Sequence, residues 1–186
     1  MSRKKVALFL VDGFEELEAI APVDILRRSG IEVDTVSITE TYNVISSRKI
    51  TILSDKLIKD INFDEYEMLI LPGGPGTDNY YSSDVLLERL KEFSVIKKVA
   101  AICAAPSILS SLGILKGKKA VSFPEYEEKI IKDGAVLTLK NVVTDCNIIT
   151  SRGAGTSIDF ALELIKVLSG EAKSEELKKQ ILYKEL

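Results

Sequence analysis

Histidine is absent from this chain of 186 residues, and cysteine occurs only twice. The absence of histidine excludes a Cys–His dyad, a Ser–His–Asp triad and any metal site that needs an imidazole ligand. Two cysteines far apart in the sequence form neither a disulfide framework nor a zinc site. We therefore expect no metal, and a reducing compartment, the cytoplasm, is the simplest location.

Long apolar runs and an excess of basic residues are also lacking. No run approaches the ~20 apolar residues of a membrane helix, and 28 acidic residues outnumber 25 basic ones. Because a nucleic-acid binder usually has a basic excess, we expect neither nucleic acid nor membrane as a partner. The start, "MSRKKVALFLVDG", has the basic beginning of a signal peptide, but its apolar run is short and ends at Asp12-Gly13, so we expect a strand there.

Patterns of strand and helix alternate along the chain. Such alternation predicts an α/β fold, in which a mostly parallel sheet carries helices on both faces, and nothing divides residues 1–186 into more than one domain. Residues 42–53 and 135–144 alternate without a helix between them, which predicts hairpins or edge strands. The expected strands are Lys5–Val11, Val33–Ile38, Met68–Leu71, Lys98–Ile102 and Asn147–Thr150, and the expected helices are Glu15–Ser29, Ser83–Phe93, Pro106–Leu112, Ile158–Leu168 and Ser174–Tyr183.

Cys103 lies where a predicted strand turns into a helix, in the stretch "VAAICAAPSILSSLG". Small neighbours allow a sharp turn like that around the serine of a nucleophile elbow, and Pro106 suits the first turn of a helix. The positive end of that helix favours thiolate over thiol, so we expect Cys103 to be mostly ionised at neutral pH. The alternative is a small buried hydrophobic residue. Cys146 precedes a strand with no helix after it, and we interpret it as structural or incidental.

A group of acidic residues follows the first predicted strand. Glu15, Glu16 and Glu18 crowd the start of the next helix, where acids commonly suit the helix dipole. Glu18 shares a helical stripe with Phe14 and Pro22, so its surroundings are apolar. A half-buried carboxyl has a raised pKa, can stay protonated and can then donate a hydrogen bond to a thiolate. Helical register alone does not exclude Glu16 from this role.

Glycines follow two further strands. In "LPGGPG", consecutive glycines after a strand can bring backbone N–H groups close to a ligand and form an oxyanion site, although such clusters are usually turns. The segment "SRGAGTS" either receives an anion at the start of the next helix or simply turns the chain. In open α/β sheets, chemistry gathers beyond the carboxyl ends of the strands, where all these segments belong.

Together, in this order and over nearly the whole chain, "EELE…PVDILRRSG", "LPGG", "AAICAAPS" and "TSRGAGTS" resemble the ThiJ/PfpI superfamily, in particular the branch of the Parkinson-associated protein deglycase. The resemblance implies a flavodoxin-like (Rossmann-type) fold and a homodimer. It also implies that Cys103 is nucleophilic or oxidisable and that Glu18 is the acid beside it.

The same resemblance assigns roles to further residues. Gly73 and Gly74 match the oxyanion glycines of the family, and the N–H of Ala104 is a further expected donor. Arg28 and Arg48 match arginines of this branch and form a possible anion-binding patch near the dimer interface; otherwise they are ordinary surface charges.

The chain departs from the family at one position. Members of this branch often carry a histidine immediately before a proline near the cysteine, where this chain has Phe123 before Pro124. The protease branch places a histidine directly after the cysteine, where this chain has Ala104. A Cys–His peptidase is therefore excluded, and activation of Cys103 is expected from Glu18, the helix dipole and backbone N–H groups.

The resemblance implies a cofactor-independent enzyme of the glyoxalase or deglycase type, with small reactive carbonyls as substrates. Cys103 would add to the carbonyl, and Glu18 would shuttle the proton. The alternative is an oxidative-stress sensor or redox-regulated chaperone, in which Cys103 is oxidised to a sulfinate. Turnover of methylglyoxal that is lost when Cys103 is replaced favours the enzyme, whereas stoichiometric oxidation without turnover favours the sensor.

Overall fold

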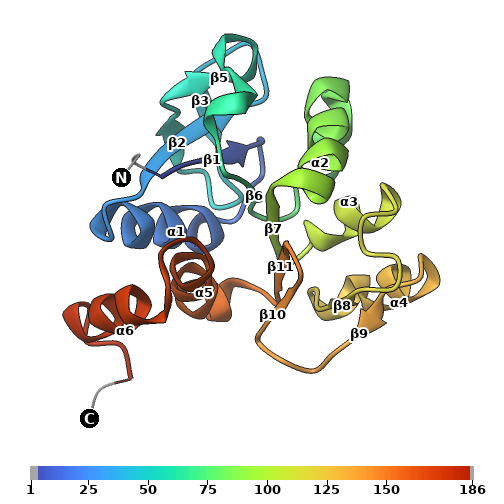
Figure 1. The fold of residues 1–186 in the computed structure, drawn as a ribbon. Helices are drawn as coiled ribbons and strands as arrows, with labels where there is room; N and C mark the ends of the chain where they lie inside the picture. Colours follow the sequence, from blue (N-terminus) through green and yellow to red (C-terminus); the bar gives the residue numbers. More distant parts are fainter. Residues whose placement is uncertain (1–3, 185–186) are drawn as a thin grey trace.

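The computed structural model describes residues 4–184 and has a seven-stranded sheet at its centre (Figure 1). The strands lie in the order β10-β11-β7-β6-β1-β2-β5, and every neighbouring pair is parallel except β10 and β11. The strands of this sheet are β1 (Lys5–Leu10), β2 (Glu32–Ser37), β5 (Lys56–Leu57), β6 (Met68–Leu71), β7 (Lys98–Ile102), β10 (Val142–Asp145) and β11 (Ile148–Ser151).

Helices cover both faces of the sheet, as predicted. In Figure 1, α1 and α5 lie on one face with α6 packed against α5, and α2, α3 and α4 lie on the other. The helices are α1 (Glu16–Arg28), α2 (Asp84–Ile96), α3 (Pro106–Ser111), α4 (Pro124–Lys132), α5 (Ser157–Ser169) and α6 (Glu171–Gln180), and the short 3₁₀ turns are η1 (Ile58–Asp60), η2 (Phe63–Glu65), η3 (Thr77–Ser82) and η4 (Ala154–Thr156).

The order of the principal parallel strands defines the fold. Numbered along the chain, β1, β2, β6, β7 and β11 lie in the spatial order 2-1-3-4-5, which is the flavodoxin-like arrangement. The strand order reverses between β1 and β6, and doubly wound sheets bind ligands at such a switch point, beyond the carboxyl ends of the strands. The predicted fold class is confirmed, and β6 is buried along its whole length because helices cover both faces.

Most predicted elements are present with small shifts at their ends. Strands β6 and β7 have the predicted bounds, and α6 begins three residues earlier than expected. Helix α4 was not predicted from the sequence. It is short and rich in charged residues, and it buries only Ile130, so too few apolar residues mark it as a helix.

The two alternating segments have different outcomes. Residues 42–53 form the predicted hairpin, in which β3 (Asn43–Ile45) pairs antiparallel with β4 (Thr51–Leu53). Residues 135–144 do not pair with each other. Strand β9 (Val136–Leu137) runs parallel to β8 (Lys119–Ala120), whereas β10 is an antiparallel edge strand against β11. The edge-strand alternative is therefore correct for β10.

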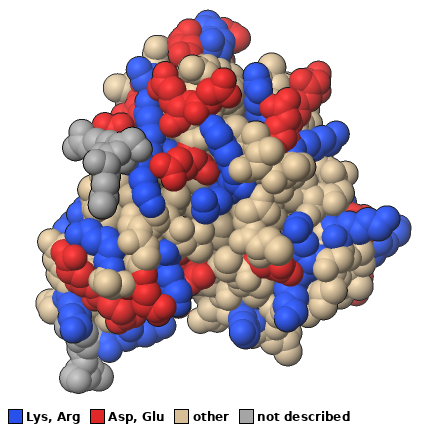
Figure 2. All heavy atoms as spheres, in the orientation of Figure 1, with Lys and Arg blue, Asp and Glu red and all other residues tan. Residues whose placement is uncertain are grey.

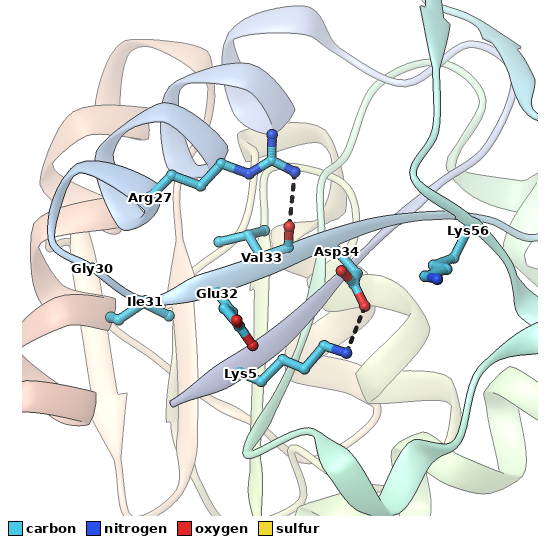
Figure 3. Close-up of a pocket in the computed structure, with 8 residues that line it drawn as sticks. All are labelled: Lys5, Arg27, Gly30, Ile31, Glu32, Val33, Asp34 and Lys56. Atoms are coloured by element: carbon cyan, nitrogen blue, oxygen red, sulfur yellow. Dashed lines mark hydrogen bonds and ion pairs between the residues drawn. The ribbon is translucent and has the colours of Figure 1, made fainter. Parts of the chain in front are cut away.

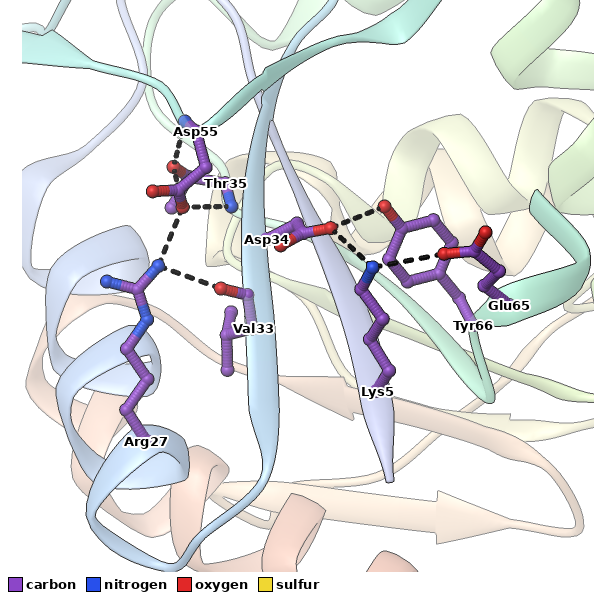
Figure 4. A network of polar contacts seen from close by, with 8 residues as sticks. All are labelled: Lys5, Arg27, Val33, Asp34, Thr35, Asp55, Glu65 and Tyr66. Carbon is purple, nitrogen blue, oxygen red and sulfur yellow. Dashed lines mark hydrogen bonds and ion pairs between the residues drawn. The ribbon is translucent and has the colours of Figure 1, made fainter. Parts of the chain in front are cut away.

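A network of paired charges holds together the amino ends of the strands (Figures 3 and 4). Lys5 Nζ lies 3.0 Å from Asp34 Oδ2 and 3.1 Å from Glu65 Oε2, and Arg27 lies 2.6 Å from Asp55. Burial opposes ionisation of Asp55, but hydrogen bonds from Thr35 and the charge of Arg27 keep its pKa below the usual value. A cavity of about 510 Å³ opens here. Because opposite charges line it together, we assign this end of the sheet a structural role.

The surface carries charges of both signs. In Figure 2, acidic and basic side chains are interspersed over the visible face rather than gathered into one basic patch. Within residues 4–184, no helix combines the length and apolar character that crossing a membrane requires.

Candidate active site

Three loops meet beyond the carboxyl ends of neighbouring strands. Glu18 lies in the first turns of α1 after β1, Gly73 follows β6, and Cys103 follows β7. Since β1 pairs with β6 and β6 pairs with β7, the three residues converge at the switch point of the sheet. The structure thus brings together the residues predicted to form the site, although they are widely separated in sequence.

Cys103 occupies a sharp turn between β7 and α3. Its φ of 64° lies in the left-handed region, which non-glycine residues rarely adopt outside tight turns and functional sites. The backbone holds this conformation from both sides: the Cys103 N–H donates to the Ser151 carbonyl at 2.9 Å, and the Cys103 carbonyl accepts from the Phe123 N–H at 2.8 Å. The expected elbow is therefore present.

Glu18 has no exposed surface. Its Oε2 accepts a hydrogen bond from the Gly73 N–H at 2.9 Å. The other oxygen, Oε1, is buried without a partner that meets ordinary hydrogen-bond geometry. The Cys103 thiol nevertheless lies close enough to the carboxyl to perturb its ionisation as a weak hydrogen-bond partner. One carboxylate oxygen is therefore fixed by the backbone, and the other has no backbone donor, in a carboxyl that neighbours the thiol.

The choice between Glu16 and Glu18 is settled by their contacts. Glu16 turns toward the β3–β4 hairpin, where it accepts hydrogen bonds from the hydroxyls of Ser46 and Ser47 and from the Arg48 N–H. Burial opposes its ionisation, but these donors outweigh burial and lower its pKa. Only Glu18 reaches the thiol.

Glu15 has a positioning role that was not assigned from the sequence. Its side chain caps α1 by accepting from the Glu18 N–H at 2.9 Å, while its own N–H donates to the Gly73 carbonyl at 2.9 Å. Gly73 is thereby bound on both sides by the first turn of α1. The Glu18 carboxyl is held in place by the helix cap and the glycine loop together.

Burial raises the pKa of the Glu18 carboxyl to about 7. The Cys103 thiol and the Gly73 N–H act in the opposite direction, and the negative charge of Glu15 raises the pKa further. Desolvation dominates because a buried carboxylate loses the water that stabilises its charge. The pKa shift has the predicted direction, and the carboxyl is fully buried rather than half-buried.

The surroundings of Cys103 contradict the expectation of a thiol largely ionised at neutral pH. Burial raises the pKa of the thiol, and the Glu18 carboxylate raises it further, while the N–H groups of Ala104 and Gly74 lower it. Helix α3 contains only six residues, so its dipole is small. Thiol and carboxyl share one buried space, and their protons therefore leave in coupled steps that belong to the pair.

The glycine loop also corrects one assignment. Gly73 does not offer its N–H to an oxyanion, because that N–H is already bound to Glu18. The N–H groups of Gly74 and Ala104 instead face the sulfur. Gly73 itself must be glycine: a Cβ there would lie 2.8 Å from the Ala104 nitrogen, the Cys103 Cβ and the Ile102 carbonyl oxygen.

Tyr80 supports the loop from beneath and was not identified from the sequence. Its fully buried hydroxyl lies 3.0 Å from the carbonyl oxygen of Phe9, at the end of β1, and 2.9 Å from that of Pro72. A hydroxyl has one proton, so these two carbonyls share it. No motif marked this residue, because its partners are backbone atoms from two other loops.

Of the other predicted residues, Phe123 lies beside the Cys103 turn, whereas the two arginines lie near opposite ends of α1. Phe123 is bound to the Cys103 carbonyl through its backbone, and its side chain is 43% exposed. Arg28 is near the end of α1 in an ion pair with Asp24, whereas the Arg48 backbone contacts Glu16 at the start of that helix. One chain therefore does not bring the two arginines together as an anion-binding patch.

The second cysteine lies at the other end of the sheet from this site. Cys146 is exposed in the turn between β10 and β11, and its thiol lies 3.3 Å from the carboxylate of Asp145. Across residues 4–184, no cluster of three or more cysteine or carboxylate side chains is arranged to hold a metal ion. The site described above consists of a thiol, a carboxyl and backbone N–H groups.

Comparison with known proteins gives the same picture over the full length. Drosophila melanogaster protein dj-1beta is 35% identical over 181 residues, covering 96% of this chain and 97% of that protein. The Danio rerio Parkinson disease protein 7 homolog is 34% identical and covers both chains completely. The structure of oxidized Toxoplasma gondii DJ-1 superposes with a TM-score of 0.92 at 34% identity, covering 98% of this chain and 100% of that one. Residues 4–167 match the DJ-1/PfpI family, and the chain belongs to that family.

Proposed function

We propose that this protein is a cofactor-independent enzyme that converts 2-oxoaldehydes to 2-hydroxy acids, with Cys103 as nucleophile and Glu18 as proton shuttle. The observation that carries the proposal is the fully buried Glu18 carboxyl beside the Cys103 thiol, in which one oxygen, Oε1, has no backbone donor. A carboxyl with a pKa of about 7 is suited to take and return a proton at neutral pH. Family membership supports the same chemistry.

The reaction needs no external oxidant or reductant. The sulfur bonds to the aldehyde carbon, and a proton from the thiol–carboxyl pair goes to the aldehyde oxygen, giving a hemithioacetal. The Glu18 carboxylate removes the hydrogen of that carbon as a proton and returns it to the neighbouring carbonyl carbon, while the hydroxyl proton of the hemithioacetal moves to the oxygen of that neighbouring carbon. The first carbon thereby reaches the thioester level as the second is reduced to an alcohol. Water then cleaves the carbon–sulfur bond, which releases the 2-hydroxy acid and restores the thiol.

Backbone donors support the negative oxygen formed in the first step. The N–H groups of Gly74 and Ala104 face the sulfur, and an oxygen on the carbon bonded to that sulfur lies within their reach. Gly73 and Glu15 keep the carboxyl in position instead of binding substrate. In this proposal Cys103 and Glu18 are the catalytic residues, and the other residues position them.

The first test is formation of lactate from methylglyoxal. We expect turnover by the unmodified protein and at least about a thousandfold loss in Cys103→Ser, because removing a nucleophile disables every later step. Cys146→Ser is the matched control and retains full turnover. Absence of lactate, together with stoichiometric oxidation of Cys103 by mild peroxide, would instead support the oxidative-stress sensor.

We also propose that two copies associate through α1 and the β3–β4 hairpin. Leu17 and Ile20 of α1 are 58% and 40% exposed, and Ile45 and Leu53 of the hairpin are 45% and 72% exposed. Contacts of Glu16 with the hairpin join these residues into one surface. An apolar surface of this kind favours association with a partner, and a second copy is the partner that the family suggests.

Light scattering tests this association. We expect a mass near twice the 20.5 kDa of one chain, because the apolar surface is covered in the dimer. Leu17→Lys should shift the mass toward one chain, since a buried unpaired charge opposes association. Val95→Lys, at an 81% exposed position of α2, is the control and leaves the mass unchanged. A single-chain mass for the unmodified protein contradicts the proposal.

A further inference from the structure

A mostly apolar cavity of about 340 Å³, open to solvent, lies next to the backbone of the Cys103 turn. One wall is the start of α4, with Phe123 and Pro124, and the other is the loop that leads into α5. The loop residues that line the cavity are Arg152, Gly153, Ala154, Gly155 and Thr156.

Both walls are attached to the peptide units of Cys103. The Cys103 carbonyl accepts from the Phe123 N–H at 2.8 Å, and the Cys103 N–H donates to the carbonyl of Ser151, the residue directly before the second wall, at 2.9 Å. The Thr156 hydroxyl donates to the Gly153 carbonyl at 2.8 Å and fixes the shape of the loop. The cavity therefore keeps a constant position relative to the thiol.

The lining suits an apolar group of moderate size. The Phe123 ring lies against the loop, where a Cβ on Gly153 would be 3.5 Å from its Cδ2 atom, and a Cβ on Gly155 would have no neighbour within 4 Å. Arg152 is held at 3.6 Å from Glu127, so its charge is partly balanced. A cavity of about 340 Å³ is large enough to seat a phenyl group, and its open side leaves a path for entry.

We propose that this cavity is the subsite for the substituent of the 2-oxoaldehyde, and that Phe123 makes it selective for aryl and other bulky apolar substituents over methyl. This inference rests on the proposed function, which places the reacting carbon on the Cys103 sulfur. We place the substituent of the neighbouring carbon there because one wall, and the residue directly before the other, are hydrogen-bonded to the Cys103 backbone. Phe123 is the specificity-determining residue because its ring offers the main aromatic contact, and stacked aromatic pairs are more favourable than their buried area alone.

The kinetic test compares phenylglyoxal with methylglyoxal. We expect kcat/KM to be at least about tenfold higher for phenylglyoxal in the unmodified protein, and Phe123→Ala to remove most of that ratio, because a filled apolar pocket discriminates by about this factor per missing group. Ile131→Ala is the matched control: Ile131 is 49% exposed, close to the 43% of Phe123, and lies in α4 outside the cavity. An unchanged ratio in Phe123→Ala overturns the inference.

A binding test in the Cys103→Ser protein separates this inference from the proposed function. Calorimetry would compare mandelate with lactate, which share a carboxylate and a hydroxyl and differ only in the substituent. We expect mandelate to bind about tenfold more tightly, and Phe123→Ala to remove the difference.

The outcomes distinguish the two claims. If no 2-oxoaldehyde is turned over but the preference for mandelate depends on Phe123, the proposed function fails and the subsite stands. If methylglyoxal is turned over and neither the kinetic nor the binding preference depends on Phe123, the function stands and the subsite is refuted.

Discussion

Replacing Glu18 with glutamine is expected to lower the turnover of 2-oxoaldehydes by about 10²–10⁴-fold, which is the usual contribution of general acid–base catalysis. Glutamine retains an oxygen that can accept from the Gly73 N–H, but it cannot carry a proton between two carbon atoms. In the unmodified protein, kcat/KM should rise with pH through about 7, where the thiol–carboxyl pair loses its first proton. In Glu18→Gln, this rise should be absent.

The same substitution should stabilise the folded protein at neutral pH. Burial raises the pKa of Glu18 from a model-peptide value of 4.5 to about 7, so the folded state binds more protons than the unfolded state between these pH values. Stability is therefore lost as the pH rises through this window. Relative to the unmodified protein, Glu18→Gln should gain on the order of 2–3 kcal/mol above pH 7 and almost nothing at pH 4.

Thermal unfolding at several pH values measures this gain, which corresponds to roughly 5–10 °C in Tm for a chain of this length. Glu16→Gln is the control, because the pKa of Glu16 is lowered and its carboxylate is held by Ser46 and Ser47. It should be less stable at neutral pH and retain turnover. Equal losses of turnover in both variants would show that Glu18 is not the proton shuttle.

Gly73→Ala should destabilise the fold strongly. The new Cβ would lie 2.8 Å from two backbone atoms and from the Cys103 Cβ, which places it closer than real Cβ contacts allow. Backbone atoms cannot turn away as a flexible side chain does, so β6 and β7 would have to separate at their carboxyl ends. We expect a loss of about 3 kcal/mol or more, or roughly 6–12 °C in Tm, and loss of the hydrogen bond to Glu18.

Gly155→Ala is the control for stability. A Cβ at Gly155 has no neighbour within 4 Å, and its φ lies outside the left-handed region. The melting temperature of this variant should match that of the unmodified protein within about 1–2 °C. A Gly73→Ala protein as stable as Gly155→Ala would contradict the close packing of the glycine loop against the Cys103 turn.

The sequence predicted elements whose burial leaves a clear pattern. Met68–Leu71 and Lys98–Ile102 are central strands covered on both faces, and short apolar runs bounded by turn residues identified their ends. Helix α4 is mostly exposed and was missed for that reason. Alternation in residues 135–144 correctly indicated strands, but alternation does not encode partners, and β9 pairs with β8.

The sequence predicted those residues of the site whose side chains have distinctive chemistry. Cys103 at a strand end and an acid in an apolar stripe could be identified from spacing. The sequence could not predict which backbone N–H group binds which partner. Gly73 and Gly74 are both glycines, and only the packing of α1 against the loop places the Gly73 N–H on Glu18. The pKa of the thiol was misjudged since burial and a neighbouring anion are tertiary effects.

The strand order has a consequence for how the protein folds. Glu18 and Gly73 are 55 residues apart in sequence, and Cys103 joins them only through the pairing of β6 with β7. Parallel pairing across such separations requires closure of long loops, and contacts of this kind slow folding. No local segment can assemble the site in advance. We therefore expect the thiol to be open to solvent in the newly made chain and to become half-buried only when the three central strands have joined.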